Sequence, residues 1–226
     1  MTTVGFIGAG RIGGTVARLA VAAGDDVVLS NSREPQTLAG LAGELGPHAR
    51  AATTAGAAEA GDLIVVSIPL KAYQEVPAGP LSGKVVIDTI NYYPARDGQF
   101  PDLDGGSATS SELLQEHLPA ARVVKCFNNI FYRHLQALAR PAGSPERTAL
   151  PIAGDDPDAK AAVTAFLDKI GYDAVDVGRL AEGRRFQPGT ALYGTIYAGG
   201  DANFTASPGV PASADAVRRS LADDPG

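Results

Sequence analysis

The chain opens on a strand-like run, a glycine-rich turn and a helical segment in direct succession. Val4–Ile7 is apolar at successive positions, Gly8-Ala9-Gly10-Arg11-Ile12-Gly13 follows it, and Ile12–Ala23 has the apolar spacing of a helix. A strand, a tight turn and a helix in this order begin a parallel α/β fold, and the amide groups at such a helix N-terminus bind phosphate. The opening of the chain therefore predicts a dinucleotide-binding turn.

Each glycine of this turn has a separate expected role. Gly8 permits the tight turn, Gly10 lets the backbone approach a pyrophosphate, and Gly13 lets the helix pack closely on the strand. Arg11 stands beside the turn, where it either stacks on an adenine ring or stays an exposed first-turn residue. A dinucleotide role is favoured over a purely structural turn, because the motif follows a strand and opens a helix.

The rest of the chain alternates in the same way between short β-branched runs and longer helical segments. Strands are expected at Val4–Ile7, Asp26–Leu29, Leu63–Ser67, Val85–Asp88, Arg122–Cys126, Leu150–Ala153 and Asp173–Val177. Most of these runs are apolar at successive positions, as in a sheet that helices cover on both faces. Helices are expected at Ile12–Ala23, Gln36–Leu45, Ser110–His117 and Asp158–Ile170. The pattern predicts a doubly wound parallel sheet, the Rossmann nucleotide-binding fold.

Two regions depart from the alternation. Tyr92–Ser107 is rich in Gly, Pro and Asp and is expected to be a loop at the end of the fourth strand. After Gly199 only Ser213–Ala222 has helical spacing, which predicts a mobile tail or a dimer arm. We therefore expect an NADP-binding Rossmann domain at residues 1–178 and a small C-terminal helical or dimerisation segment at 179–226.

The end of the second strand indicates which dinucleotide is bound. An NAD-specific site places Asp or Glu about 20 residues beyond the turn to accept the ribose hydroxyls. This chain has Asn31, Ser32 and Arg33 there, and the first carboxylate is Glu34. A planar guanidinium and a hydroxyl suit a 2′-phosphate, so NADP(H) is predicted. The alternatives are that Glu34 turns inward, or that Arg33 is a solvated residue.

Two further strand ends are expected near the ligand, because ligands of open α/β sheets lie beyond the carboxyl ends of the strands. Ser67, Ile68 and Pro69 follow the third strand, and Asn91 follows the fourth. We expect these residues to approach the ribose and the nicotinamide. Asp88 is expected to be a turn-forming residue that bonds nearby backbone.

The fifth strand end supplies the candidate substrate contacts, which are Phe127, Asn128 and Asn129. The two amides either bind a carbonyl or a ring edge of a substrate, or form a turn. No compact Tyr-x-x-x-Lys pair and no metal site is recognisable that would protonate or polarise a carbonyl. The available acids are each expected to pack or to lie at the surface: Tyr92, Tyr93, Lys125, Tyr132 and His134. The sequence identifies no catalytic residue.

Composition and charge exclude several other classes of protein. The formal net charge is −6 and no Lys/Arg cluster stands out, so neither nucleic acid nor an anionic membrane is an expected partner. One cysteine, Cys126, and three scattered histidines indicate neither a disulfide nor a metal site. No apolar segment is long enough to cross a bilayer and no basic n-region precedes Val4, so a cytoplasmic location is expected.

These motifs together resemble the NADPH:coenzyme F420 oxidoreductase family, whose nucleotide domain is similar to the reductase domain of the membrane-bound STEAP ferric reductases. The resemblance covers roughly Thr3 to Tyr193 and is carried by Gly8–Gly13, Ser32-Arg33, Ser67-Ile68-Pro69, Val123–Ile130 and Ile152–Asp156. It implies reversible hydride transfer between a nicotinamide and the deazaflavin ring of coenzyme F420, which needs ring alignment more than a proton donor. It also implies NADP(H) contacts at Ala9, Gly10, Arg11, Ile12, Ser32, Arg33, Ile68 and Asn91. Asn129 departs from the family, which usually has Thr there.

Two alternatives to hydride exchange between NADP(H) and a deazaflavin or flavin stay open. One is an NADPH-dependent reductase of a small imine or carbonyl compound, with Tyr132 or His134 as the acid. The other is a non-catalytic NADP(H)-sensing module that binds a protein through its tail. A homodimer is also expected, because an exposed apolar patch would otherwise form from Phe186, Leu192, Tyr193, Ile196 and Tyr197.

Overall fold

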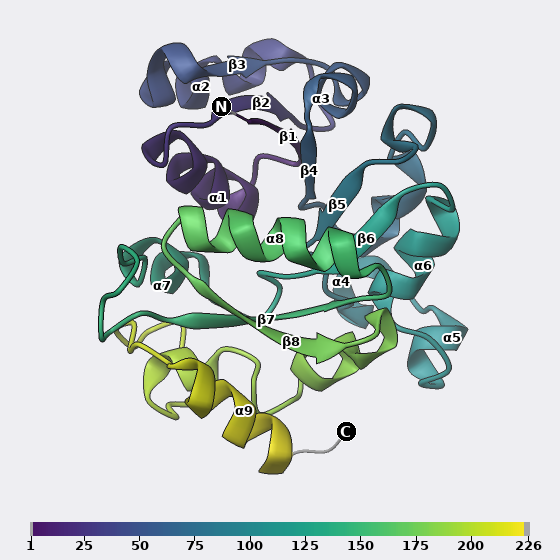
Figure 1. The fold of residues 1–226 in the computed structure, drawn as a ribbon. Helices are drawn as coiled ribbons and strands as arrows, with labels where there is room; N and C mark the ends of the chain where they lie inside the picture. The colour runs from purple at the N-terminus through teal and green to yellow at the C-terminus, as the bar shows by residue number, and fades with distance from the viewer. Residues whose placement is uncertain (1, 224–226) are drawn as a thin grey trace. The chain divides into compact units, whose positions relative to one another are not determined.

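Parallel strands form the sheet of the first of two units in the computed structural model, which describes residues 2–223 (Figure 1). Across the sheet of this unit, residues 1–123, the order is β3 (Ala49–Ala51), β2 (Asp26–Ser30), β1 (Thr3–Ile7), β4 (Leu63–Val66) and β5 (Val85–Asp88). β1 pairs in parallel with β2 on one side and with β4 on the other. The strand order therefore reverses at β1, and such a switch point is where open α/β sheets bind their ligands.

Helices connect these strands and cover the sheet. They are α1 (Arg11–Ala22), α2 (Ala39–Leu45), α3 (Thr54–Ala60), α4 (Pro94–Asp97), α5 (Pro101–Asp104) and α6 (Ser110–His117). Four 3₁₀ helices add short turns: η1 (Pro35–Leu38), η2 (Gly46–His48), η3 (Leu70–Glu75) and η4 (Gly79–Leu81). α6 begins where expected because Thr109 and Glu112 form a reciprocal capping box.

The strands of this unit are apolar on both faces, as predicted. Every residue of β4 and β5 is buried, and Val4 and Phe6 of β1 are fully inaccessible to solvent. The predicted doubly wound α/β fold is confirmed. Tyr92–Ser107, expected to be a loop, contains the one-turn helices α4 and α5. The sequence also missed β3 and α3.

The second unit, residues 124–226, is built on a small sheet of its own strands. β7 (Ala149–Gly154) and β8 (Asp173–Gly178) are parallel and joined by α8 (Pro157–Lys169), whose N-terminus is capped by Asp156. β6 (Arg122–Lys125) crosses the boundary between the units, and its last two residues pair with β7 in the antiparallel sense. This antiparallel pair is an exception to the parallel pairing that was predicted for the strands. The connection between β6 and β7 contains α7 (Tyr132–Ala137). It leads from the end of β6 to the start of β7 at the same edge of the sheet, as antiparallel pairing of two successive strands requires.

The C-terminal segment folds back onto this unit. The expected helix is present as α9 (Ala214–Asp223), and Figure 1 shows α8 and α9 on opposite faces of β7 and β8. Val217 and Leu221 of α9 pack in a cluster with Phe186, which ends η5 (Leu180–Phe186), and with Leu192. Phe186, Leu192 and Tyr197, which lies in η6 (Thr195–Ala198), are at most 1% exposed.

The reason given for a homodimer does not hold in this structure, because the chain covers most of the apolar patch itself. The homodimer stays a prediction. The division at residue 178 also stays a prediction, since the two units divide at Val123 instead. No helix within residues 2–223 is long and apolar enough to cross a membrane. In the same part of the chain, no group of His, Cys, Asp and Glu side chains could hold a metal ion.

Candidate dinucleotide site

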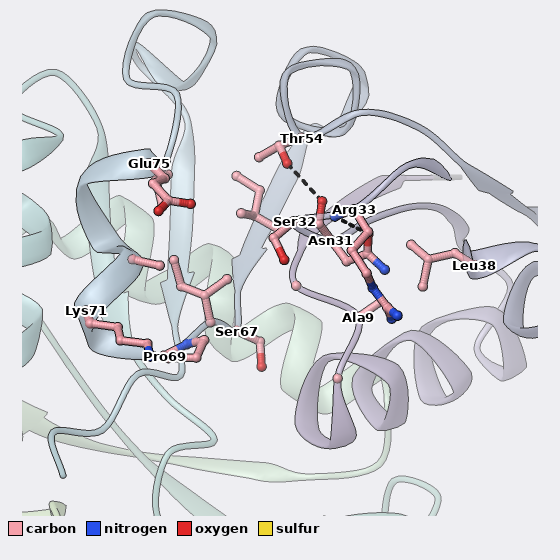
Figure 2. Close-up of a pocket in the computed structure, with 16 residues that line it drawn as sticks. Ala9, Asn31, Ser32, Arg33, Leu38, Thr54, Ser67, Pro69, Lys71 and Glu75 are labelled. Atoms are coloured by element: carbon pink, nitrogen blue, oxygen red, sulfur yellow. Dashed lines mark hydrogen bonds between the residues drawn. The ribbon is translucent and has the colours of Figure 1, made fainter. Parts of the chain in front are cut away.

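A pocket of about 500 Å³ lies in the first unit at the carboxyl ends of β1, β2 and β4 (Figure 2). It is therefore at the switch point of the sheet. The residues that line it are Ile7, Gly8, Ala9, Gly10, Asn31, Ser32, Arg33, Leu38, Thr54, Ser67, Ile68, Pro69, Lys71, Ala72, Glu75 and Val76. Most of the residues predicted to bind a cofactor are thus brought together: Gly8, Ala9, Gly10, Asn31, Ser32, Arg33, Ser67, Ile68 and Pro69.

The three glycines of the turn occupy three different environments. Gly8 has φ +99°, and a Cβ there would lie 2.2 Å from the Ser67 carbonyl oxygen. A Cβ on Gly13 would lie 2.1 Å from the carbonyl oxygen of Gly8. Around Gly10, by contrast, no atom lies within 4 Å of where a Cβ would be. Gly8 and Gly13 are therefore required by the fold, whereas Gly10 keeps open a space in the pocket that a side chain would fill.

The N-terminus of α1 opens onto this space. Gly10 is the N-cap residue, so no side chain caps the helix, and its first turn contains no acidic residue. The amide groups of a first helical turn carry partial positive charge and bind anions. Open space beside an uncapped helix N-terminus suits the pyrophosphate of a dinucleotide.

The turn after β2 supplies a cation to its own end of the pocket, while Lys71 belongs to the opposite wall. Arg33 lines the pocket and is exposed, and within residues 2–223 no carboxylate is paired with its guanidinium. Glu34, which could have replaced the missing NAD-type carboxylate, is not among the lining residues. Of the described residues that line the pocket, only Glu75 is acidic, and in the view of Figure 2 it lies on the side opposite Arg33. This end of the pocket favours a phosphate over a ribose diol.

The opposite wall is η3, which sequence reasoning missed. Lys71, Ala72 and Glu75 of η3 line the pocket, as do Val76, Leu38 and Thr54. Pro69 lies three residues beyond the end of β4 and is the N-cap residue of η3. The same proline therefore precedes the helix that forms this wall. A proline directly after a strand was the available signal, but it shows only that the strand stops.

A buried carboxylate ties η3 to the region after β5. The Asp97 side chain is 0% exposed, receives two hydrogen bonds from Arg96 at 2.8 and 2.9 Å, and accepts from the Tyr93 N–H at 3.0 Å. Burial raises the pKa of the Asp97 carboxyl, but the bonds from Arg96, Tyr93 N–H and Lys71 N–H outweigh it and hold that pKa below its ordinary value. Asp97 is therefore charged at neutral pH and stabilises the backbone at the start of η3.

Four predicted cofactor residues of the first unit do not line the pocket: Arg11, Ile12, Gly13 and Asn91. Arg11 is exposed and Ile12 is half-buried on the first turn of α1, while Gly13 packs under the turn. Asn91 is half-buried, and its carbonyl oxygen accepts a hydrogen bond from Arg96 at 2.9 Å. Contacts of Arg11, Ile12 and Asn91 with a cofactor stay predictions.

The predicted substrate contacts belong to the second unit and are buried there. Phe127 is fully buried and has φ +62°, the left-handed region that bulky residues rarely adopt. Asn128 Nδ2 donates to the Phe186 carbonyl at 2.9 Å, and Asn129 Nδ2 donates to the Leu192 carbonyl at 2.9 Å. The amides predicted to bind a substrate therefore hold the segment after η5, and substrate binding by these residues stays a prediction.

The side chains considered as acids are engaged in other contacts. His134 is 2% exposed, and its Nε2 lies 2.8 Å from the Ser207 carbonyl, so that nitrogen carries the proton. The Tyr132 hydroxyl accepts from Arg133 Nε at 3.1 Å. Burial, followed by a 2.7 Å hydrogen bond to Asp104, raises the pKa of Tyr92. A raised pKa makes the Tyr92 hydroxyl a poorer proton donor, and the contacts of His134 and Tyr132 are all made within the protein.

Comparison with known proteins agrees with this geometry. A family model described as NADP oxidoreductase, coenzyme F420-dependent, matches residues 3–92, which include the whole pocket. The metalloreductase STEAP3 of Rattus norvegicus is 30% identical over 186 residues, or 81% of this chain. The chain spans only 35% of the length of that relative.

Two solved structures share the fold along most of their length. A hypothetical protein of Sinorhizobium meliloti is 29% identical with a TM-score of 0.74, and the match covers 85% of this chain and 93% of that one. A protein of Arthrobacter sp. FB24, assigned as an F420-dependent NADP reductase, is 25% identical with a TM-score of 0.70. That match covers 81% of this chain and 88% of the other. Residues 3–92 of the chain therefore match the model of the family of coenzyme F420-dependent NADP oxidoreductases.

Proposed function

We propose that this protein exchanges hydride between NADP(H) and a deazaflavin of the coenzyme F420 type, or a flavin. The observation that carries the proposal is the pocket at the switch point. At one end Ser32 offers a hydroxyl and Arg33 a guanidinium that no carboxylate within residues 2–223 pairs with. Among the described residues that line this end, none carries a carboxylate that could bind a ribose diol. The family model that matches residues 3–92 supports the same assignment.

Each part of the pocket has a role in holding the nucleotide. The open space at Gly10 and the uncapped N-terminus of α1 would receive the pyrophosphate. Ser32 and Arg33 would bind the 2′-phosphate. Ile68 and Pro69, beyond the end of β4, would pack against the nicotinamide half, since that strand end lies on the other side of the switch point.

Such an exchange places few chemical demands on side chains. Bound NADPH supplies two electrons and a proton as hydride, and one further proton from water completes reduction of the acceptor. The protein would contribute orientation and exclusion of water. The engaged state of His134 and Tyr132 is consistent with a reaction that needs no acid, and it argues against the imine or carbonyl reductase.

Deuterium tracing with a panel of acceptors tests the proposal. NADPH deuterated at either face of C4 would be mixed with the protein and coenzyme F420, FMN, a cyclic imine or a ketone, and the reduced acceptor analysed by mass spectrometry. We expect deuterium in the reduced deazaflavin or flavin, and none when Gly10→Val protein is used. Labelled product only from the imine or ketone would replace the proposal with the second function. Failure with every acceptor, despite NADPH binding, would contradict any catalytic role.

A further inference from the structure

The side chain of Asn31 is used inside the turn that presents Ser32 and Arg33. Its Oδ1 accepts a hydrogen bond from the Arg33 N–H at 2.9 Å. Its Nδ2 donates to Thr37 Oγ1 at 3.0 Å. The first bond is that of an Asx turn, in which a side-chain oxygen takes the place of a backbone carbonyl and fixes the two following residues.

The rest of the turn is held from both sides. Thr37 Oγ1 donates to the Glu34 carbonyl at 2.7 Å, which anchors the end of the turn on η1. Thr54 Oγ1 of α3 donates to the Asn31 carbonyl at 3.4 Å, the contact drawn as a dashed line in Figure 2. The side chains of Ser32 and Arg33 are exposed. Their starting positions are therefore set by the backbone, which these hydrogen bonds hold in place.

This arrangement separates Asn31 from its two neighbours. Within the described part of the chain, the side chains of Ser32 and Arg33 form no hydrogen bond that would compete with a phosphate, whereas both polar ends of the Asn31 amide are occupied. Binding an exposed, flexible arginine to a phosphate costs side-chain entropy, and a turn fixed in advance reduces that cost. We propose that Asn31 is a positioning residue for 2′-phosphate recognition, which acts through Arg33 without itself binding the cofactor.

The inference rests on the proposed function, since it assumes that Arg33 binds the 2′-phosphate. It also differs from the sequence prediction, in which Asn31 was one of the cofactor contacts. A positioning role predicts a specific pattern of cofactor affinities. Removing the Asn31 side chain should weaken NADPH but not NADH, and it should do so only while Arg33 is present.

A double-mutant cycle, in which NADPH and NADH affinities are measured by calorimetry, tests this pattern. Asn31→Ala should weaken NADPH binding about three- to tenfold, the range for one hydrogen-bonded contact, and should leave NADH within about twofold. In the Arg33→Ala background the same substitution should have little further effect on NADPH. Asn31→Ser, whose hydroxyl can form a weaker version of the turn, should restore part of the affinity.

Asn31→Asp separates turn geometry from charge. The substitution keeps an oxygen that can accept from the Arg33 N–H, but adds a carboxylate where NAD-specific sites have theirs. NADPH should weaken by more than in Asn31→Ala, and NADH should not weaken. Thermal unfolding of each variant within about 3 °C of the parent would show that folding is intact.

The possible failures are distinguishable. If Arg33→Ala weakens NADPH and NADH equally, the 2′-phosphate assignment itself is wrong. A second outcome is that Arg33→Ala weakens NADPH binding selectively, but Asn31→Ala weakens NADPH binding equally in the presence and in the absence of Arg33. Asn31 would then not act through Arg33, and only the present inference would be overturned. An equal loss of both cofactors in Asn31→Ala would likewise overturn it.

Discussion

Adding one methyl group at Gly10 or at Gly13 should separate cofactor binding from folding within a single motif. At Gly10 the new Cβ meets no atom within 4 Å and φ is −77°, which alanine adopts freely. Alanine is a poorer N-cap than glycine by roughly 0.5–1 kcal/mol, while loss of glycine's freedom in the unfolded chain returns about 0.4–1 kcal/mol. The free energy of unfolding of Gly10→Ala should therefore change by less than about 0.5 kcal/mol, or about 2 °C in Tm.

The same methyl group at Gly13 should have the opposite profile. Its Cβ would lie 2.1 Å from the Gly8 carbonyl oxygen, so α1 must move away from the turn. Such overpacking typically costs about 1–3 kcal/mol, which lowers Tm by roughly 2–12 °C in a chain of this size. Gly10→Ala should instead lose contact with the charged pyrophosphate, worth about 1.5–3 kcal/mol, and bind NADPH about tenfold to a hundredfold more weakly.

Calorimetric titration with NADPH and thermal unfolding of the two variants, beside the parent, form the assay. Unchanged NADPH affinity in Gly10→Ala would show that no phosphate lies against Gly10. Unchanged Tm in Gly13→Ala would show that the close approach of α1 to the turn is not required. Either result would refute the division of roles derived from the structure.

Three further predictions concern stability and reactivity. Leu221→Ala should lower the free energy of unfolding by about 2 kcal/mol, and hence Tm by about 4–8 °C, because Leu221 anchors α9; no change would mean that α9 does not pack. Asp97→Asn should destabilise the protein at neutral pH. Because the pKa of Asp97 is lowered by folding, its contribution is complete above the ordinary value of 3.8 and is lost below it, so chemical unfolding of parent and variant should converge in acid. Cys126 is fully buried and burial raises the pKa of its thiol, so a thiol reagent should label it only after denaturation.

The local signals of the sequence were sufficient for the nucleotide half of the protein. The motif from Gly8 to Gly13 follows β1 and runs into the first turn of α1, and the helix at Ser110–His117 has the predicted bounds. Both are determined by residues close in sequence: Gly8 and Gly13, where the fold leaves no room for a side chain, and the capping pair of Thr109 and Glu112. The residues after β1, β2 and β4 then meet in one pocket because the topology of a parallel sheet brings strand ends together.

Features that depend on distant partners could not be predicted in this way. β3 has three residues and α3 is largely alanine and glycine, so neither carries a strong pattern. The antiparallel pairing of β6 with β7 depends on how a long connection returns. Asn128 and Asn129 look like ligands in the sequence, but carbonyls 58 and 63 residues away accept their hydrogen bonds. Phe186 and Leu192, two of the apolar residues that predicted self-association, likewise pack against α9, and no local pattern shows where this helix docks.

The central claim is that the turn after β2 recognises the 2′-phosphate of NADP(H). Calorimetric dissociation constants of NADPH and NADH for the parent and for Arg33→Ala test it most directly. We predict that the parent binds NADPH much more tightly than NADH. Arg33→Ala should weaken NADPH binding about tenfold or more and leave NADH binding nearly unchanged, since a charge-assisted bond is worth about 1.5–3 kcal/mol. Equal affinity of the parent for both cofactors, or an equal loss of both in the variant, would contradict it.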